Sequence, residues 1–193
     1  MFGLDYRGEY YYQWGDAMDA AHSAGNNQVL YTTGVGAAGV GAEIDRQAYM
    51  FGVRVGKQFK NVSMKPKLTL WYDYLSGTSD DDARNGDYKS FNTVYDTGHK
   101  FYGLQDVFLG VGNNSCGKGT CGMGLQDAAI KAQVSPVAGW TLKADYHWFN
   151  TAAGVAGSPQ RALTGAGVSN DSELGQELDV TLVNKYNANT KIM

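Results

Sequence analysis

The first segment of the chain alternates strictly between apolar and polar side chains. Between Phe2 and Trp14 the apolar residues fall on one parity and the charged residues on the other. The apolar parity is Leu4, Tyr6, Tyr10, Tyr12 and Trp14, and the polar parity is Asp5, Arg7, Glu9 and Gln13. Because successive side chains of a β-strand point to opposite faces, this pattern predicts a strand with one apolar and one charged face.

The same two-faced pattern recurs along the chain in segments of about ten residues, rich in aromatics near their ends. It predicts five further strands at about 46–59, 67–76, 124–135, 140–150 and 174–187. Short turns at 60–66 and 135–139 alternate with long polar connections. That asymmetry is typical of outer-membrane barrels, with short periplasmic turns and long extracellular loops. We therefore expect an all-β fold, an antiparallel up-and-down transmembrane β-barrel.

Composition agrees with a barrel and argues against other classes. Mean hydropathy is −0.36, and Gly (26) and Tyr (13) are abundant in the 193 residues. No run approaches the roughly 18 to 20 apolar residues of a membrane helix. The net charge of −3 argues against nucleic acid as a partner. We expect localisation in the outer membrane of a Gram-negative cell, with membrane lipid as a partner.

The long connections carry two ambiguous segments. Residues 15–45 are rich in Gly, Ala, Ser and Asn and predict a loop, with a short strand at 29–33 as an option. Residues 101–108 are apolar enough for a strand, but lipid-facing parity would place Asp106 in lipid, which is costly. We interpret them as a loop element, a helical turn or a lid.

Six strands are fewer than the roughly eight of the smallest known outer-membrane barrels. Residues 187–193 look like a turn that enters a further strand. We therefore expect residues 1–193 to be a single β-barrel domain that is incomplete, with strands missing on both sides.

Four motifs have a structural and a functional interpretation. Cys116 and Cys121 lie in a glycine-rich stretch, and we predict a loop disulfide rather than a metal knuckle, which would need two more ligands. The glycines of 34–39 match a dinucleotide fingerprint but precede a strand, so we predict a flexible loop. The carboxylates of 79–87 lack calcium-loop spacing, which favours a solvated loop over opportunistic divalent binding.

The fourth motif is His147 with Asp145, two residues apart on one strand face. An enzymatic interpretation would make this pair the start of a hydrolytic site. No serine occupies an obviously matching register on a neighbouring strand. We expect a protein that is not an enzyme and that holds no cofactor and no metal.

Four blocks, at 91–103, 125–127, 142–147 and 177–182, resemble the alginate export family of outer-membrane porins. The most specific block is Phe-Asn-Thr-Val-Tyr-Asp-Thr-Gly-His-Lys-Phe-Tyr-Gly at 91–103. The resemblance covers most of the chain from Ala48 onward. It implies the carboxy-terminal part of a large monomeric barrel that passes polysaccharide or small solutes by diffusion. It also places the next hairpin just after Met193.

The candidate site is the charged face that would line the lumen. Its basic residues are Arg7, Arg54, Lys131, Lys143 and Lys185; its acidic residues are Asp5, Glu9, Asp73, Asp127, Asp145, Glu177 and Asp179, and His147 joins them. The family's best-studied members line their constriction with Arg and Lys. The mixture here predicts a porin-like channel without assigning alginate as its cargo. The competing hypothesis is a non-transporting envelope barrel, an adhesin or structural protein that acts through its long loops.

The basic and acidic residues of this face differ in how many residues separate them from the nearest short turn. The five basic residues lie about three to six residues from a turn, and Asp73, Asp127, Glu177 and Asp179 about seven or more, on strands that rise about 3.3 Å per residue. We expect a basic collar near the periplasmic mouth, beneath a more acidic zone. The alternative is that these charges pair across strands.

Overall fold

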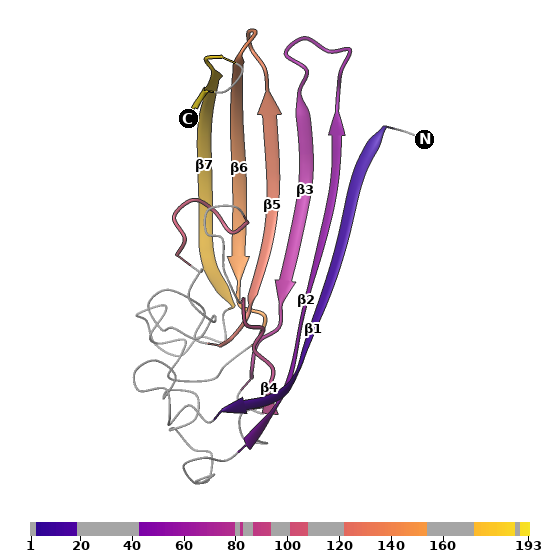
Figure 1. The fold of residues 1–193 in the computed structure, drawn as a ribbon, viewed down its shortest axis with the longest axis vertical. Helices are drawn as coiled ribbons and strands as arrows, with labels where there is room; N and C mark the ends of the chain where they lie inside the picture. The colour runs from indigo at the N-terminus through magenta and orange to yellow at the C-terminus, as the bar shows by residue number, and fades with distance from the viewer. Residues whose placement is uncertain are drawn as a thin grey trace.

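A computed structural model of the chain describes residues 3–18, 43–79, 82, 87–93, 101–107, 122–153, 172–187 and 190–193. They form one eight-stranded sheet (Figure 1). The strands are β1 (Leu4–Met18), β2 (Glu43–Gln58), β3 (Lys67–Leu75), β4 (Asp87–Tyr88), β5 (Leu125–Val134), β6 (Trp140–Asn150), β7 (Glu173–Lys185) and β8 (Lys191–Ile192).

The strands follow one another across the sheet in the order β1-β2-β3-β5-β6-β7-β8, and each neighbour is antiparallel. The turns 59–66 and 135–139 lie at the upper end of Figure 1, and the opposite ends of these strands, such as the end of β3 and the start of β5, lie at the lower end. We call these the turn end and the loop end. The predicted up-and-down meander and its asymmetry of connections are therefore confirmed.

The structure corrects the predicted strands in three respects. The count is eight rather than about six, because the two-residue strands β4 and β8 join the six long ones. Strands β1 and β2 extend farther toward the loop end, where Met18 is paired with Glu43. β4 pairs in parallel with Asp45 and Arg46 of β2, an exception to the antiparallel pattern. Periodicity cannot reveal strands of two residues.

Other predictions concern the connections. Residues 101–107 contain no strand, which confirms that they are a loop element. The backbone amide of Thr190 donates to the side-chain oxygen of Asn187, and the further strand expected after it begins as β8, which pairs with the end of β7. The optional strand at 29–33, the glycine loop 34–39, and Cys116 with Cys121 lie outside the described residues, and their disulfide stays a prediction.

The sheet has two faces of opposite character. Large hydrophobic side chains of one face are exposed to the outside: Tyr6 (84%), Tyr10, Trp14, Leu70, Leu178, Val180 and Leu182. We call this the apolar face. The other, polar face buries Arg54, Asp73, Asp127, His147 and Glu177. Soluble domains show the reverse arrangement, with charged groups outside.

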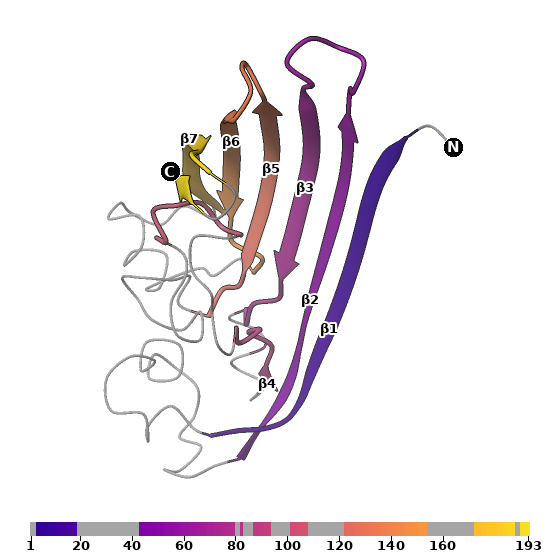
Figure 2. The same ribbon diagram turned by 45° about the horizontal axis from the view of Figure 1, so that its top comes forward.

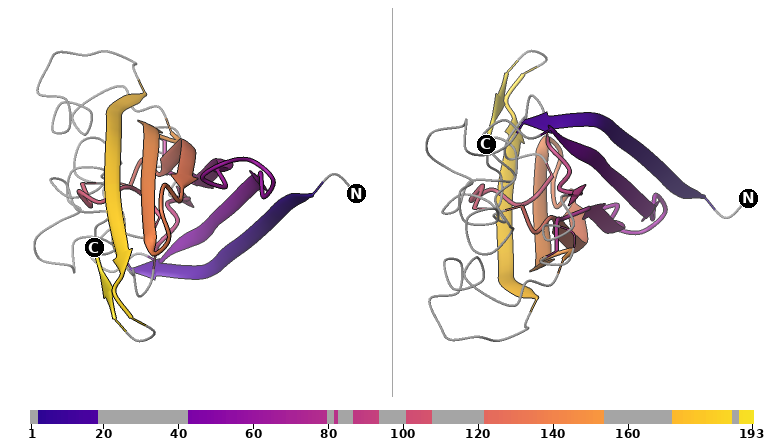
Figure 3. Two further views of the ribbon diagram at one scale, coloured as in Figure 1. Left: turned by 90° about the horizontal axis from the view of Figure 1, so that it is seen from above. Right: turned by 90° about the horizontal axis from the view of Figure 1, so that it is seen from below.

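The sheet is curved, and the indigo β1 and the yellow β7 lie toward its opposite edges (Figure 3). Figure 2 shows β4 beside the loop end of β2, with which it pairs. There a small core forms over the polar face from Ala48, Leu75, Phe91, Tyr102, Leu125 and Phe149. Within the described ranges, no helix is long and apolar enough to cross a membrane.

Candidate functional site

The register arranges the polar face in four cross-strand rows, numbered from the turn end. Row 1 is Gln58, Lys67, Gln133, Lys143 and Thr181; row 2 is Asp5, Gly56, Thr69, Lys131, Asp145 and Asp179; row 3 is Arg7, Arg54, Trp71, Ala129, His147 and Glu177; row 4 is Glu9, Gly52, Asp73, Asp127, Phe149 and Gly175. The rows contain every predicted site residue except Lys185, which is exposed at the turn end opposite Lys191.

Arg54 is the centre of the first charge cluster. Its guanidinium forms ion pairs with Glu9 and, at 3.4 Å, with Asp73. It also stacks on Trp71, with Cζ 3.7 Å from the ring centroid, and the indole Nε1 donates to Asp73 at 3.0 Å. Because Arg54 is buried and contacts both carboxylates, it is part of the wall rather than a group free to bind a solute.

His147 is the centre of the second cluster. Its Nδ1 lies 2.9 Å from both carboxylate oxygens of Asp127, and its Nε2 lies 3.2 Å from the ammonium of Lys131. Lys131 also donates to Asp145 at 3.3 Å. Since an ammonium can only donate, Nε2 is the acceptor and Nδ1–H donates to Asp127.

The two clusters supply partners for acidic pairs that the register brings together. Asp73 lies directly opposite Asp127 in row 4, and Asp145 lies directly opposite Asp179 in row 2. Like charges at such positions destabilise a sheet. Arg54 forms an ion pair with Asp73, and His147 donates a hydrogen bond to Asp127. Cross-strand pairing therefore accounts for much of the charge on this face.

This geometry does not form a hydrolytic site. The partner of His147 is Asp127 rather than Asp145, the residue that the enzymatic alternative paired with it, and Nε2 faces an ammonium where a hydrolase would place a hydroxyl. Among the described residues, no group of three or more His, Cys, Asp and Glu side chains could hold a metal ion.

A glycine makes room for the Arg54 cluster. A Cβ on Gly52 would collide with Oδ1 of Asp73 and lie 3.8 Å from Nη2 of Arg54. We expect Gly52→Ala to lower the free energy of unfolding by about 1–3 kcal/mol, the usual cost of overpacking a filled site. Chemical denaturation would measure it. Gly8→Ala on β1 is the matched control, because nothing lies within 4 Å of its Cβ; equal losses in both variants would contradict the steric explanation.

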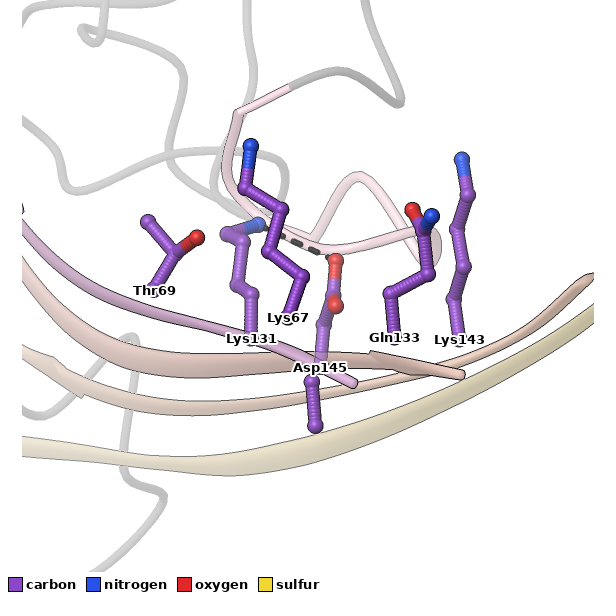
Figure 4. Close-up of a pocket in the computed structure, with 7 residues that line it drawn as sticks. Lys67, Thr69, Lys131, Gln133, Lys143 and Asp145 are labelled. Atoms are coloured by element: carbon purple, nitrogen blue, oxygen red, sulfur yellow. Dashed lines mark hydrogen bonds and ion pairs between the residues drawn. The ribbon is translucent and has the colours of Figure 1, made fainter. Parts of the chain in front are cut away.

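Row 1 differs from the other rows because its lysines project into open space. Lys143 makes no ion pair with any described residue, and Lys67 approaches only the exposed Asp5, at 3.9 Å. With Lys131, Gln133, Thr69 and Asp145 they line a cavity of about 190 Å³ on the concave side of the strands (Figure 4). The sequence analysis missed Lys67, although it has the same parity as Thr69, Trp71 and Asp73.

The register modifies the predicted order of charges. Row 1 is basic and row 4 is acidic, as a collar beneath an acidic zone requires. Rows 2 and 3 are mixed, however, and Arg54 and Glu177 share row 3. The expected two layers are therefore replaced by a basic row 1, two mixed rows and an acidic row 4. Of the lysines in these rows, Lys131 has a carboxylate at 3.3 Å, whereas the nearest ion-pair partner of Lys67 is 3.9 Å away and Lys143 pairs with no described residue.

Within the acidic run 79–87, Asp82 is held by side chains of its own loop. Asp82 accepts hydrogen bonds from Ser79 and, at 2.5 Å, from Lys89. Partial burial would raise the pKa of Asp82, but these hydrogen bonds outweigh it and hold the pKa below its ordinary value. The carboxylate already has a cation, which argues against a divalent ion at this residue.

Comparison with known proteins identifies the family of the chain. No curated protein matches the chain in sequence. The family model described as alginate export matches residues 2–193, almost the whole chain. The match includes all four rows and all the long strands, and we conclude that the chain belongs to the alginate export family.

Proposed function

We propose that this protein is part of an outer-membrane channel through which a polysaccharide or a small polar solute diffuses. The observation that carries the proposal is the inverted burial of the sheet: ion pairs lie inside, and aliphatic side chains lie outside. A sheet with this distribution suits lipid on its apolar face and a water-filled lumen on its polar face. Family membership supports transport rather than catalysis.

Aromatic side chains on the apolar face support a membrane-spanning band. At the loop end, Tyr10, Tyr49, Tyr74, Phe51 and Tyr72 form a run of neighbouring rings with centroids 5.3–6.4 Å apart. At the turn end, the exposed aromatics are Phe59, Trp140 and Tyr186. Val55, Leu68, Leu70, Ile130, Leu178 and Val180 lie between them. Girdles of this kind mark the two interfaces of outer-membrane barrels.

The edges of the sheet support a larger barrel. Among the described residues, the outer edge of β1 has no partner strand, and β8 covers only two residues of β7. Unpaired backbone groups cost several kcal/mol each in lipid, so membrane sheets close on themselves. We propose that further strands pair with both edges and complete a monomeric barrel.

Row 1 supports an anionic solute. Lys67 and Lys143 extend from a cavity wall whose only carboxylate, among the described lining residues, belongs to Asp145. Asp145 is already paired with Lys131. Lysines without a close carboxylate partner raise the local concentration of anions, whereas the saturated Arg54 cluster does not. The solute class we propose is therefore a saccharide or small molecule with negative charge.

Planar-bilayer recording of the full-length protein tests this function. We expect discrete conducting channels whose reversal potential in a salt gradient shows a preference for anions. Lys67→Gln with Lys143→Gln should reduce this preference most at low salt, because at about 1 M salt the screening length falls to about 3 Å.

The matched control is Lys57→Gln, which removes the same charge from the apolar face near Phe59. It should leave selectivity unchanged. A folded protein that never conducts would refute the channel and favour the non-transporting envelope barrel. Conductance with unchanged selectivity in the double variant would retain the channel but remove the role of row 1.

A further inference from the structure

Residues 101–107 cross part of the polar face, from β3 to β7. Phe101 lies against Trp71 of β3, with ring centroids 6.1 Å apart, and 5.6 Å from Cζ of Arg54 on β2. A few residues later, Leu104 and Gln105 contact Glu177 of β7. The segment, drawn in rose in Figure 1, passes in front of β6 and β7. It therefore lies over the part of row 3 between Arg54 and Glu177.

Backbone amides attach the segment to β7. The amides of Leu104 and Gln105 donate to one carboxylate oxygen of Glu177, at 2.8 and 2.9 Å. The Leu104 amide also lies 3.1 Å from Asp179. Glu177 is only 7% exposed. Hydrogen bonds to a carboxylate are stronger than those between neutral groups, so these contacts attach the segment firmly to β7.

Glycine is required at the point of closest approach. Gly103 has a φ of +83°, which side chains disfavour, and a Cβ there would lie 2.6 Å from Cδ of Glu177. The adjacent Tyr102 is 4% exposed within the loop-end core. Apolar packing on one side of Gly103 and a carboxylate on the other fix the segment against the wall.

We propose that residues 101–107 form a fixed constriction over row 3, that Glu177 is the residue that positions it, and that this constriction limits the size of the solute that passes. The inference rests on the proposed channel function. The segment occupies space beside rows that would otherwise face the open lumen, and pore diameter controls which solutes pass. Glu177 thus acts through the loop rather than by contacting the solute.

Two measurements on the full-length protein test the proposal. In Glu177→Ala, hydrogen exchange of the peptide that covers residues 101–107 should accelerate about 10- to 100-fold, the factor for loss of hydrogen bonds to a charged acceptor. Single-channel conductance should rise roughly twofold as the pore widens, and neutral oligosaccharides excluded by the wild type should enter proteoliposomes. Glu177→Gln retains a carbonyl acceptor, so its exchange rate and conductance should lie between those of the wild type and Glu177→Ala.

Glu173→Ala is the matched control, since it removes a carboxylate from the exposed start of the same strand; exchange, conductance and size limit should stay at wild-type values. Gly103→Ala disrupts the same contact from the loop side and should change exchange, conductance and size limit as Glu177→Ala does. The double variant should change them no further. This second variant keeps the test decisive if Glu177→Ala does not fold.

The outcomes distinguish the attachment of residues 101–107 by Glu177 from the proposed channel function. Unchanged exchange in Glu177→Ala would show that Glu177 does not hold the segment, and faster exchange with an unchanged size limit would show that the segment does not constrict the pore; either result overturns the proposal. A wild type that does not conduct would overturn the channel function and the size limit, whereas faster exchange in Glu177→Ala would still support the positioning role.

Discussion

Replacing Arg54 with Gln should lower the free energy of unfolding by about 3–5 kcal/mol, the cost of removing one partner from a buried ion pair. The side chain of Arg54 is 9% exposed, and that of Asp73 is fully buried. After the substitution, Asp73 keeps the indole N–H of Trp71 but loses its cation. It also faces Asp127 across the strand pair without compensation from Arg54. Denaturant unfolding in detergent micelles would measure the loss.

The matched control is Arg7→Gln on the neighbouring strand. Arg7 and Arg54 both form ion pairs with Glu9. The Arg7 pair has a distance of 2.8 Å, but the side chain of Arg7 is 62% exposed. Solvent screens such a pair, so the expected loss is about 1 kcal/mol or less. The loss of unfolding free energy in Arg54→Lys should lie between those of Arg54→Gln and Arg7→Gln. Lysine keeps the positive charge, but an ammonium cannot reproduce the planar guanidinium that contacts two carboxylates. Similar small losses for Arg54→Gln and Arg7→Gln would show that burial does not strengthen the Arg54 cluster.

Period-two alternation was enough to predict the long strands and their faces. It worked because each strand has an apolar and a polar side, as at Leu142 and Lys143, and because short turns fix the pairing of adjacent strands. It could not predict the partners across the long connection between β3 and β5. That pairing places Asp73 opposite Asp127, which makes the roles of Arg54 and His147 necessary.

The site was only partly predictable for the same reason. The charged residues could be listed from parity, but their grouping into rows depends on register. Asp127, not the sequence neighbour Asp145, is the partner of His147, because cross-strand geometry brings the two side chains together. The contact between Glu177 and the amides of Leu104 and Gln105 joins residues more than 70 positions apart through backbone groups. Side-chain patterns contain no signal for such a contact.

Placing an arginine at Val180 should lower the free energy of unfolding by about 2–4 kcal/mol in a lipid bilayer, the range for a cation near the midplane of a barrel's lipid face. Val180 is 63% exposed on the apolar face, beside Leu178 and Leu182 on the same strand. In a water-soluble protein, a substitution at so exposed a site would change stability by about 0.5 kcal/mol or less. Denaturant unfolding of the protein in lipid vesicles would measure the loss of unfolding free energy. A loss of the size expected in lipid would show that the apolar face lies in the bilayer.

Thr181→Arg is the control at nearly the same depth on the opposite face. Thr181 lies in row 1 opposite Lys143, so the added charge meets one like charge, a cost of up to about 1 kcal/mol. Because the lumen is hydrated in the proposed channel, no lipid penalty is added. A loss for Val180→Arg well above that for Thr181→Arg would place the apolar face in the bilayer. Equal small losses would show water on both faces, and the inverted burial would then need a protein partner over the apolar face.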